Sequence, residues 1–195
     1  MLFERRCAGC GRVGWVICQS CIAGLQPAPL DARPPTITNC IDSFVAATAY
    51  DPLAARLILA AKNGGRRDVL RALAAPLIGA IEAADVGAVA WVPASRARRR
   101  RRGYDQAEVL ARAVARQLRV PAGRFVRRRD SSAQANRSRE QRLVGPSILL
   151  RRRPPGAVLL IDDVATTGAS LAASAAALRA GGAKRVDAAV LAVVG

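Results

Sequence analysis

The apolar positions of residues 43–195 fall into short runs that alternate between two patterns. Runs typical of buried strands predict strands at residues 43–51, 86–92, 123–126, 157–161 and 185–194. Apolar residues at helical spacing predict helices at residues 52–62, 66–84, 104–118 and 170–180. Pro76 predicts a kink in the second of these helices. Strands that alternate with helices favour an α/β fold, in which a mainly parallel sheet carries helices on its faces.

The first 42 residues break this pattern. Residues 1–25 contain four cysteines, and residues 26–42 begin with four prolines in ten positions. We therefore expect a small four-cysteine module at 1–25, a proline-rich linker at 26–42 and one α/β domain at 43–195. Within that domain, residues 129–156 are polar and rich in arginine. A stretch of this length without its own secondary structure is typical of a lid, a binding loop or a disordered segment.

The cysteines of the module follow the spacing C-x2-C-x7-C-x2-C. They are Cys7, Cys10, Cys18 and Cys21. Two close pairs suit a tetrahedral thiolate site, and four thiolates leave no open position, so the pattern predicts a structural zinc ion. Coincidental cysteines or a redox pair are the alternatives. Cys40 stands apart, and we interpret it as a small buried hydrophobe rather than a fifth ligand.

The charge of the chain is strongly unbalanced. Its 31 basic and 14 acidic residues give a formal net charge of +17, and Lys62 and Lys184 are its only lysines. Codon usage accounts for arginine over lysine but not for the basic excess. The excess indicates a polyanionic partner, such as phosphates, a nucleic acid or an acidic protein. The absence of histidine excludes histidine-based triads, histidine general bases and imidazole metal sites.

Nothing in the sequence predicts insertion into a membrane. Apolar runs stay well short of the roughly 18 residues that a membrane helix needs. The first residues lack the apolar region of a signal peptide, so a cytoplasmic location is the expectation.

The stretch VLLIDDVATTGAS at residues 158–170 predicts a ligand site. Its strand ends at Asp162 and Asp163, and the turn from Thr166 to Ser170 leads into a helix. Ligands of parallel sheets bind beyond the carboxyl ends of the strands, and a helix N-terminus preceded by glycine suits a phosphate monoester. The carboxylates would repel a phosphate unless they hold sugar hydroxyls or a bridging magnesium ion. Neither a Walker P-loop nor a dinucleotide fingerprint is present. Alternatively, Asp162 and Asp163 are only the solvated end of a strand and bind no ligand.

This stretch closely resembles the phosphoribosyl-diphosphate (PRPP) motif of type I phosphoribosyltransferases. The wider chain resembles the ComF family, which includes competence protein ComF and GntX-like proteins. The residues that carry this resemblance are the double C-x2-C, YDPLAARLILAAKNGG at 50–65 and VPASRARRRRRGYDQAEVLA at 92–111. The resemblance implies a type I phosphoribosyltransferase-like sheet, PRPP as ligand, magnesium as its cofactor and a link to DNA uptake.

The resemblance also implies residue roles. Asp162 and Asp163 would be the catalytic residues that hold the 2′- and 3′-hydroxyls of the ribose. The 5′-phosphate would be held by Thr166, Thr167, Gly168, Ala169 and Ser170. The pyrophosphate would be met by Pro93, Ala94, Ser95, Arg96 and Arg102. Residues 129–156 would be the flexible loop over the active site. The chain departs from the family at Asp105 and Arg142, where asparagine is usual.

Two functions from different classes follow from these patterns. The first is a magnesium-dependent phosphoribosyltransferase that uses PRPP; a site that binds a ribose phosphate without catalysing transfer is its plainer form. The second is a non-catalytic accessory protein of DNA uptake that binds single-stranded DNA or a helicase partner. Residues 96–102 contain six arginines in seven positions. Such a run is typical either of a solvated segment or of a nucleic-acid patch. Tyr104 is interpreted as a packing residue.

Overall fold

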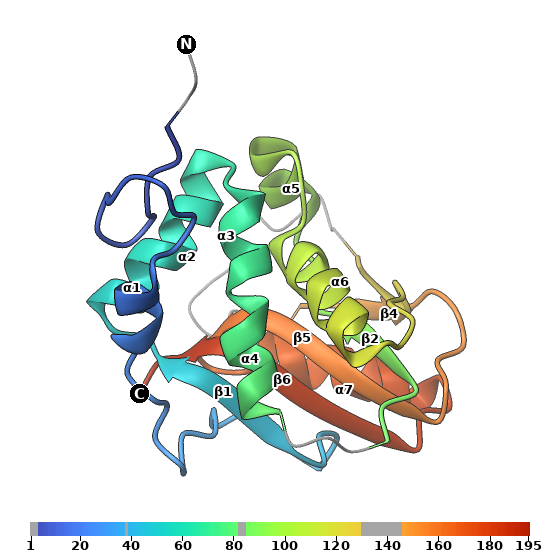
Figure 1. The fold of residues 1–195 in the computed structure, drawn as a ribbon. Helices are drawn as coiled ribbons and strands as arrows, with labels where there is room; N and C mark the ends of the chain where they lie inside the picture. The colour runs from blue at the N-terminus through green and yellow to red at the C-terminus, as the bar shows by residue number, and fades with distance from the viewer. Residues whose placement is uncertain (1–3, 38, 82–84, 130–145) are drawn as a thin grey trace, which may run out of the picture.

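A sheet of parallel strands lies at the centre of the fold (Figure 1). The computed structural model describes residues 4–37, 39–81, 85–129 and 146–195. In these residues four strands pair in the order β1-β6-β5-β2, and every pair is parallel. Their bounds are Phe44–Ala49 for β1, Ala88–Trp91 for β2, Ala157–Ala165 for β5 and Arg185–Val193 for β6. The predicted α/β fold with a mainly parallel sheet is confirmed.

Helices cover both faces of this sheet (Figure 1). One face carries α2 (Pro52–Gly64), α3 (Arg67–Ala72), α4 (Ala74–Ala80) and α6 (Gln106–Leu118), and the other carries α7 (Ala169–Ala180). Successive side chains of a strand point to opposite faces. In β5, Leu159 and Ile161 therefore join the core under α2, α3, α4 and α6, whereas Val158 and Leu160 join the core under α7. Burial on both faces explains the unbroken apolar run of this strand.

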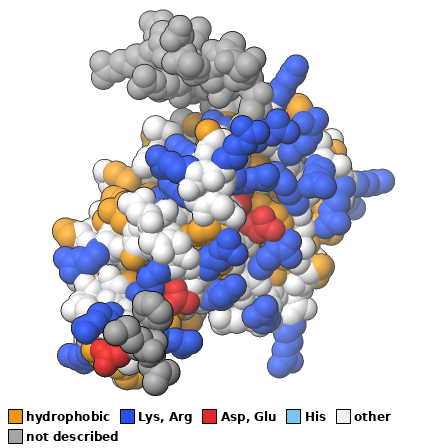
Figure 2. Space-filling model, turned by 90° about the horizontal axis from the view of Figure 1, so that it is seen from above, with side chains coloured by type: hydrophobic (Ala, Val, Ile, Leu, Met, Phe, Trp, Pro, Cys, Tyr) orange, Lys and Arg blue, Asp and Glu red, His pale blue; other side chains and the backbone are white. Residues whose placement is uncertain are grey.

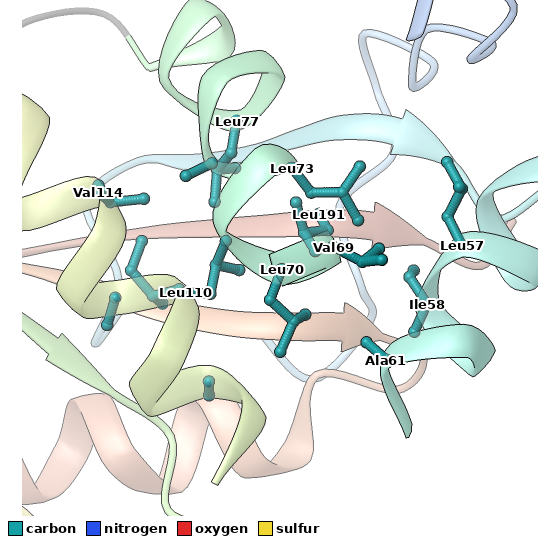
Figure 3. Close-up of a cluster of buried hydrophobic side chains, with 14 of the residues drawn as sticks. Leu57, Ile58, Ala61, Val69, Leu70, Leu73, Leu77, Leu110, Val114 and Leu191 are labelled. Carbon is teal, nitrogen blue, oxygen red and sulfur yellow. The ribbon is translucent and has the colours of Figure 1, made fainter. Parts of the chain in front are cut away.

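The larger core lies between the sheet and the four-helix face (Figure 3). Leu70, Leu77 and Leu110 come from three different helices, and all three are fully buried against one another and the strands. Leu191 of β6 meets them from the sheet side. Cysteines of the N-terminal module belong to the same core, so the module is an extension of the domain core in space.

The predicted helix at 66–84 is divided in two. The structure has α3 and α4 with a break at Leu73, and residues 82–84 lie outside the described residues. Pro76 explains the break, because it has no N–H to donate to the carbonyl of Ala72 and its ring would clash with that carbonyl. The proline thus stands in the first turn of α4, a position that tolerates it.

Several short elements differ from the predictions. The basic run forms helix α5 (Arg96–Arg102), which begins where the Ser95 hydroxyl accepts a hydrogen bond from the N–H of Arg98 at 3.3 Å. It ends at Gly103, whose φ of 74° favours glycine. A three-residue strand, β3, lies at Val126–Arg128 rather than at 123–126.

The segment predicted as one long loop contains a strand. Strand β4 (Ile148–Leu150) lies within it and pairs antiparallel with β3. Residues 130–145 lie outside the described residues, and these include Arg142. A further short helix, α1 (Gln19–Ala23), lies in the four-cysteine module. Among the described residues, no helix is long and apolar enough to span a bilayer.

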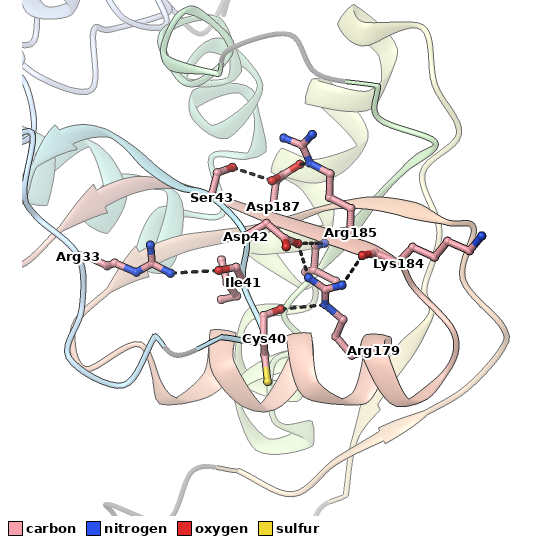
Figure 4. A network of polar contacts seen from close by, with 10 residues as sticks. Arg33, Cys40, Ile41, Asp42, Ser43, Arg179, Lys184, Arg185 and Asp187 are labelled. Carbon is pink, nitrogen blue, oxygen red and sulfur yellow. Dashed lines mark hydrogen bonds and ion pairs between the residues drawn. The ribbon is translucent and has the colours of Figure 1, made fainter.

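A polar network ties the start of β1 to β6 and α7 (Figure 4). The Asp42 carboxylate accepts a hydrogen bond from the N–H of Val186 at 2.7 Å and pairs with Arg179. The Asp187 carboxylate accepts the Ser43 hydroxyl at 2.7 Å. Burial would raise the pKa of Asp42, but the Val186 N–H and the Arg179 guanidinium lower it. These contacts set the register of the edge strand where its hydrogen-bonded ladder begins.

Two leucines of α2 provide a matched test of this core. Leu57 is fully buried, whereas Leu59 on the same helix is 45% exposed. We expect Leu57→Ala to lower the free energy of unfolding by about 2–5 kcal/mol, because the cavity adds to the lost burial. Leu59→Ala should cost less than about 0.5 kcal/mol. Urea denaturation of both variants measures the difference, and equal losses would contradict the described packing of α2.

Candidate active site and metal centre

A cavity of about 530 Å³ opens at the carboxyl end of the parallel strands. Its lining includes the end of β5, the turn into α7, the turn after β2, part of α5, the start of α6 and the last turns of α2. Each of these segments is positioned by the sheet, because parallel strands end at one common edge. The cavity therefore gathers residues that are far apart in the sequence.

Two adjacent carboxylates form part of this lining. Asp162 and Asp163 lie within β5, which continues to Ala165, so the prediction that the strand stops before them is wrong. The carboxylate of Asp162 accepts the N–H of Asp163 at 2.8 Å, and that of Asp163 accepts the N–H of Val164 at 2.9 Å. Burial raises the pKa of Asp162 well above its usual range, and the charge of Asp163 raises it further.

Lys62 is the cation that faces this acid pair. Its Nζ lies 3.0 Å from Oδ2 of Asp163, and the two side chains are only 19% and 16% exposed. The residue stands in the last turn of α2 and lines the cavity. No role of Lys62 was predicted from the sequence, although the rarity of lysine was a usable indication, since Lys184 is the only other lysine in the chain.

The turn from Thr166 to Ser170 borders the cavity next to the acid pair. Gly168 has a φ of 79° and precedes α7, whose first N–H groups have no partner within the helix. A Cβ at this glycine would lie 2.8 Å from Cβ of Pro34. The N–H of Thr36 also donates to the Thr167 carbonyl at 3.2 Å. Part of the predicted linker is thus packed against the turn and supports it from behind.

The turn after β2 forms another side of the cavity. Pro93 and Ala94 line it, whereas Ser95 caps α5 and Arg96 begins that helix; the latter two are not among the described lining residues. The buried carboxylate of Asp105 accepts the N–H of Ala94 at 3.0 Å. Burial raises the pKa of Asp105. This carboxylate holds the turn in place from the start of α6.

Arginines give the cavity a basic rim. The lining arginines are Arg98, Arg101, Arg102 and Arg128. Of these, only Arg102 was among the predicted site residues. Its guanidinium donates to the side-chain carbonyl of Gln106 at 2.7 Å. On the face shown in Figure 2, Lys and Arg side chains gather and acidic side chains are sparse. The rim therefore suits an anionic ligand.

Tyr104 precedes α6 and packs as expected. It lies against the larger core, its hydroxyl donates to the carbonyl of Ala61, and the Arg67 guanidinium lies 4.6 Å from its ring centre. Burial raises its pKa. The packing interpretation is confirmed, and the contact fastens the last turn of α2 beside the cavity.

One comparison with known proteins bears on this geometry. Residues 105–194 match the family model described as phosphoribosyl transferase domain. These residues are therefore similar to a phosphoribosyltransferase domain. Comparison with curated proteins found no match to the chain. The matched residues contain the acid pair and the turn before α7, and they begin at Asp105.

The four cysteines of the N-terminal module come together in space. Their Sγ atoms all lie within 4.8 Å of one another. The Sγ atoms of Cys7 and Cys21 are 3.7 Å apart, and those of Cys10 and Cys18 are 3.6 Å apart. A tetrahedral zinc ion bound at about 2.3 Å requires sulfur atoms about 3.8 Å apart. The four thiols are thus positioned to hold a metal ion. Cys40 is not part of this group and packs against the smaller core.

The local environment of the sulfur atoms differs among the cysteines. Burial would raise the pKa of Cys7, but hydrogen bonds from the backbone of Cys10, Cys18 and Gly9 lower it to about 6. Burial and the neighbouring cysteines raise the pKa of Cys21 to about 12. The backbone N–H groups that point at sulfur are typical of the short turns in which paired cysteines bind a metal ion. A bound dication would hold all four as thiolates.

The module is fastened to α2 and to the turn before α3. The Arg56 guanidinium donates to the carbonyl of Gly9 at 2.8 Å, and that of Arg66 donates to the carbonyl of Arg6 at 2.7 Å. A Cβ at Gly9 would lie 2.6 Å from Sγ of Cys21, so only glycine fits between the sulfur and the helix. The metal centre is thus continuous with the helix that ends at the cavity.

Metal removal tests this centre. Because Cys7, Cys18 and Cys21 belong to the larger core, Cys7→Ser should release the metal and lower the melting temperature by several degrees. Cys40→Ser is the control and should keep the metal and the native melting temperature. Mass spectrometry of the bound metal and thermal unfolding measure the two properties. A Cys7→Ser variant that retains a full equivalent of metal would contradict the assignment.

Proposed function

We propose that the chain binds PRPP in the cavity at the carboxyl end of the sheet and acts as a magnesium-dependent phosphoribosyltransferase. The observation that carries this proposal is the acid pair of β5 beside the glycine turn that opens α7, within one arginine-rimmed cavity. The family match over residues 105–194 supports the same chemistry. The four-cysteine module is proposed to hold a structural zinc ion, and the ComF family and a cytoplasmic location stay predictions.

The lining of the cavity supports the following residue roles. The first N–H groups of α7, with the hydroxyls of Thr166, Thr167 and Ser170, receive the 5′-phosphate. Asp162 and Asp163 accept hydrogen bonds from the ribose hydroxyls. The diphosphate then points toward the turn of Pro93 and Ala94, where the rim is basic. The lining arginines bind its charge, and Ser95 and Arg96 act indirectly by starting α5.

The reaction is a displacement at C1 of the ribose. The bond from C1 to the diphosphate oxygen breaks as the acceptor attacks, and the ring gains oxocarbenium character. Negative charge grows on the leaving diphosphate, so fixed cations near it lower the barrier. We propose that Arg98, Arg101 and Arg102, which line the cavity, supply that stabilisation. Carboxylate and diphosphate oxygens suit magnesium, which would neutralise part of the same charge when bound.

Calorimetric titration with PRPP and magnesium tests this function. Asp162→Asn/Asp163→Asn should weaken PRPP binding by at least about tenfold, because charged acceptors of the ribose hydroxyls are lost. The control is Asp31→Asn, an exposed carboxylate outside the cavity lining, which should bind like the native protein. The proposal fails if the native protein binds no PRPP, or if the double variant binds it equally well.

A second candidate function is binding of a polyanion, such as single-stranded DNA, along the exposed arginines. Helix α5 carries six arginines and buries none of its residues. The nearby aromatic rings of Tyr104 and Phe125 are packed in the protein and covered by arginines, so they offer no free platform for base stacking. Contacts with phosphates alone would make this binding sensitive to salt and indifferent to sequence.

Arginines outside the cavity lining separate the two functions. Arg100 and Arg127 are exposed and do not line the cavity, so Arg100→Gln/Arg127→Gln should leave PRPP binding intact. The slope of log affinity for oligo-dT against log salt should fall by about 1 to 1.5. Arg116→Gln/Arg119→Asn, at the far end of α6, is the control. An affinity for oligo-dT that does not respond to salt would exclude this function.

A further inference from the structure

The carboxylate of Asp163 has protein partners on both oxygens. Oδ1 accepts the N–H of Val164 at 2.9 Å, and Oδ2 lies 3.0 Å from Nζ of Lys62. Both side chains of the ion pair are largely buried, so water screens their attraction less than it would at the surface. The pair thus differs from the exposed ion pairs of the chain, such as that between Arg6 and Glu4.

The backbone next to Lys62 is held by a residue that lies just before α6. The hydroxyl of Tyr104 donates to the carbonyl of Ala61, the residue before Lys62, and the guanidinium of Arg67 covers the tyrosine ring. The last turn of α2 is therefore fastened where its lysine reaches the acid pair. A lysine on a frayed helix end would lose more backbone entropy in making the same contact.

The ammonium group changes what the acid pair can bind. Two adjacent carboxylates without a cation would attract a divalent metal ion, since Mg²⁺ and Mn²⁺ prefer oxygen ligands. With Lys62 in place, one of the four carboxylate oxygens faces a positive charge that repels such an ion. Asp162 is the neighbour, and one of its oxygens already accepts the N–H of Asp163. The free protein therefore presents a poor divalent site despite its two carboxylates.

We propose that Lys62 is a positioning residue whose ammonium acts as the built-in counter-ion of the acid pair. It holds Asp163 in one orientation for the ribose hydroxyls, and it keeps free divalent cations out of the pair. The role of Lys62 toward the ribose hydroxyls rests on the proposed function. The ion pair between Lys62 and Asp163 does not depend on that function.

The experiment measures Mn²⁺ binding to the free, zinc-loaded full chain by electron paramagnetic resonance. Lys62→Met removes the ammonium and keeps an unbranched side chain. It should bind one Mn²⁺ at least about tenfold more tightly than the native protein does. Asp163→Asn added to Lys62→Met should abolish the gain. Lys184→Met, an exposed lysine outside the cavity, is the control and should bind Mn²⁺ like the native protein.

The Lys62→Arg variant distinguishes the effect of the positive charge on Mn²⁺ affinity from the effect of side-chain shape. This variant keeps the cation, so its Mn²⁺ affinity should stay at the native level, whereas Lys62→Gln should behave like Lys62→Met. A merely structural lysine would alter thermal stability in all of these variants without raising Mn²⁺ affinity. Unchanged Mn²⁺ affinity in both folded neutral variants overturns the inference. If Lys62→Met does not fold, Lys62→Gln and Lys62→Arg decide the question.

PRPP titration distinguishes failure of this inference from failure of the proposed function. A native protein that binds no PRPP refutes the proposed function, while the Mn²⁺ result still decides whether Lys62 is the counter-ion. If the native protein binds PRPP with magnesium, Lys62→Met should bind it about tenfold more weakly, because Asp163 is no longer held. Native PRPP affinity in Lys62→Met together with unchanged Mn²⁺ affinity refutes the inference alone.

Discussion

The hydrogen bonding of β5 on both of its edges is the constraint on which the site depends. The strand pairs with β2 on one side and with β6 on the other, and the pairing with β6 continues past the acid pair to Ala165. Its apolar residues are buried by helices on both faces. The strand therefore has no freedom to shift, and the backbone of Asp162 and Asp163 is held by the sheet itself. The Cα positions from which the two carboxylates extend are therefore fixed.

Helix α2 connects the two chemical centres of the molecule. One part of the helix carries Arg56, which donates to the backbone of the four-cysteine module, and its last turn carries Lys62 at the cavity. Between them, Leu57, Ile58 and Ala61 are buried in a core that also contains three of the cysteines. Folding of the metal centre and placement of the lysine thus depend on the same packing. Although nearly all basic residues of the chain are arginines, the basic residue that pairs with Asp163 is a lysine.

Much of this organisation follows from local patterns. Apolar runs predicted the strands of the sheet, cysteine spacing predicted the group of four cysteines that could hold a metal ion, and the glycine and hydroxyls of residues 166–170 predicted the turn before α7. The errors have physical causes. Pairing with β6 extended β5 beyond its apolar run, a proline divided one predicted helix, and a serine and a glycine capped α5 out of a basic run. The short ladder of β3 and β4 had no apolar alternation to reveal it.

By itself, the sequence determined the fold class, the group of four cysteines that could hold a metal ion and the turn of glycine and hydroxyls before α7, because each depends on residues that are neighbours along the chain. Only the tertiary structure decided that Lys62 faces Asp163, that Asp105 holds the turn at Ala94, and that the proline-rich segment supports Gly168. These contacts join residues that the chain separates widely or whose side-chain directions depend on packing. No periodicity or spacing encodes such contacts, since they arise only when helices and strands are brought to one edge of the sheet.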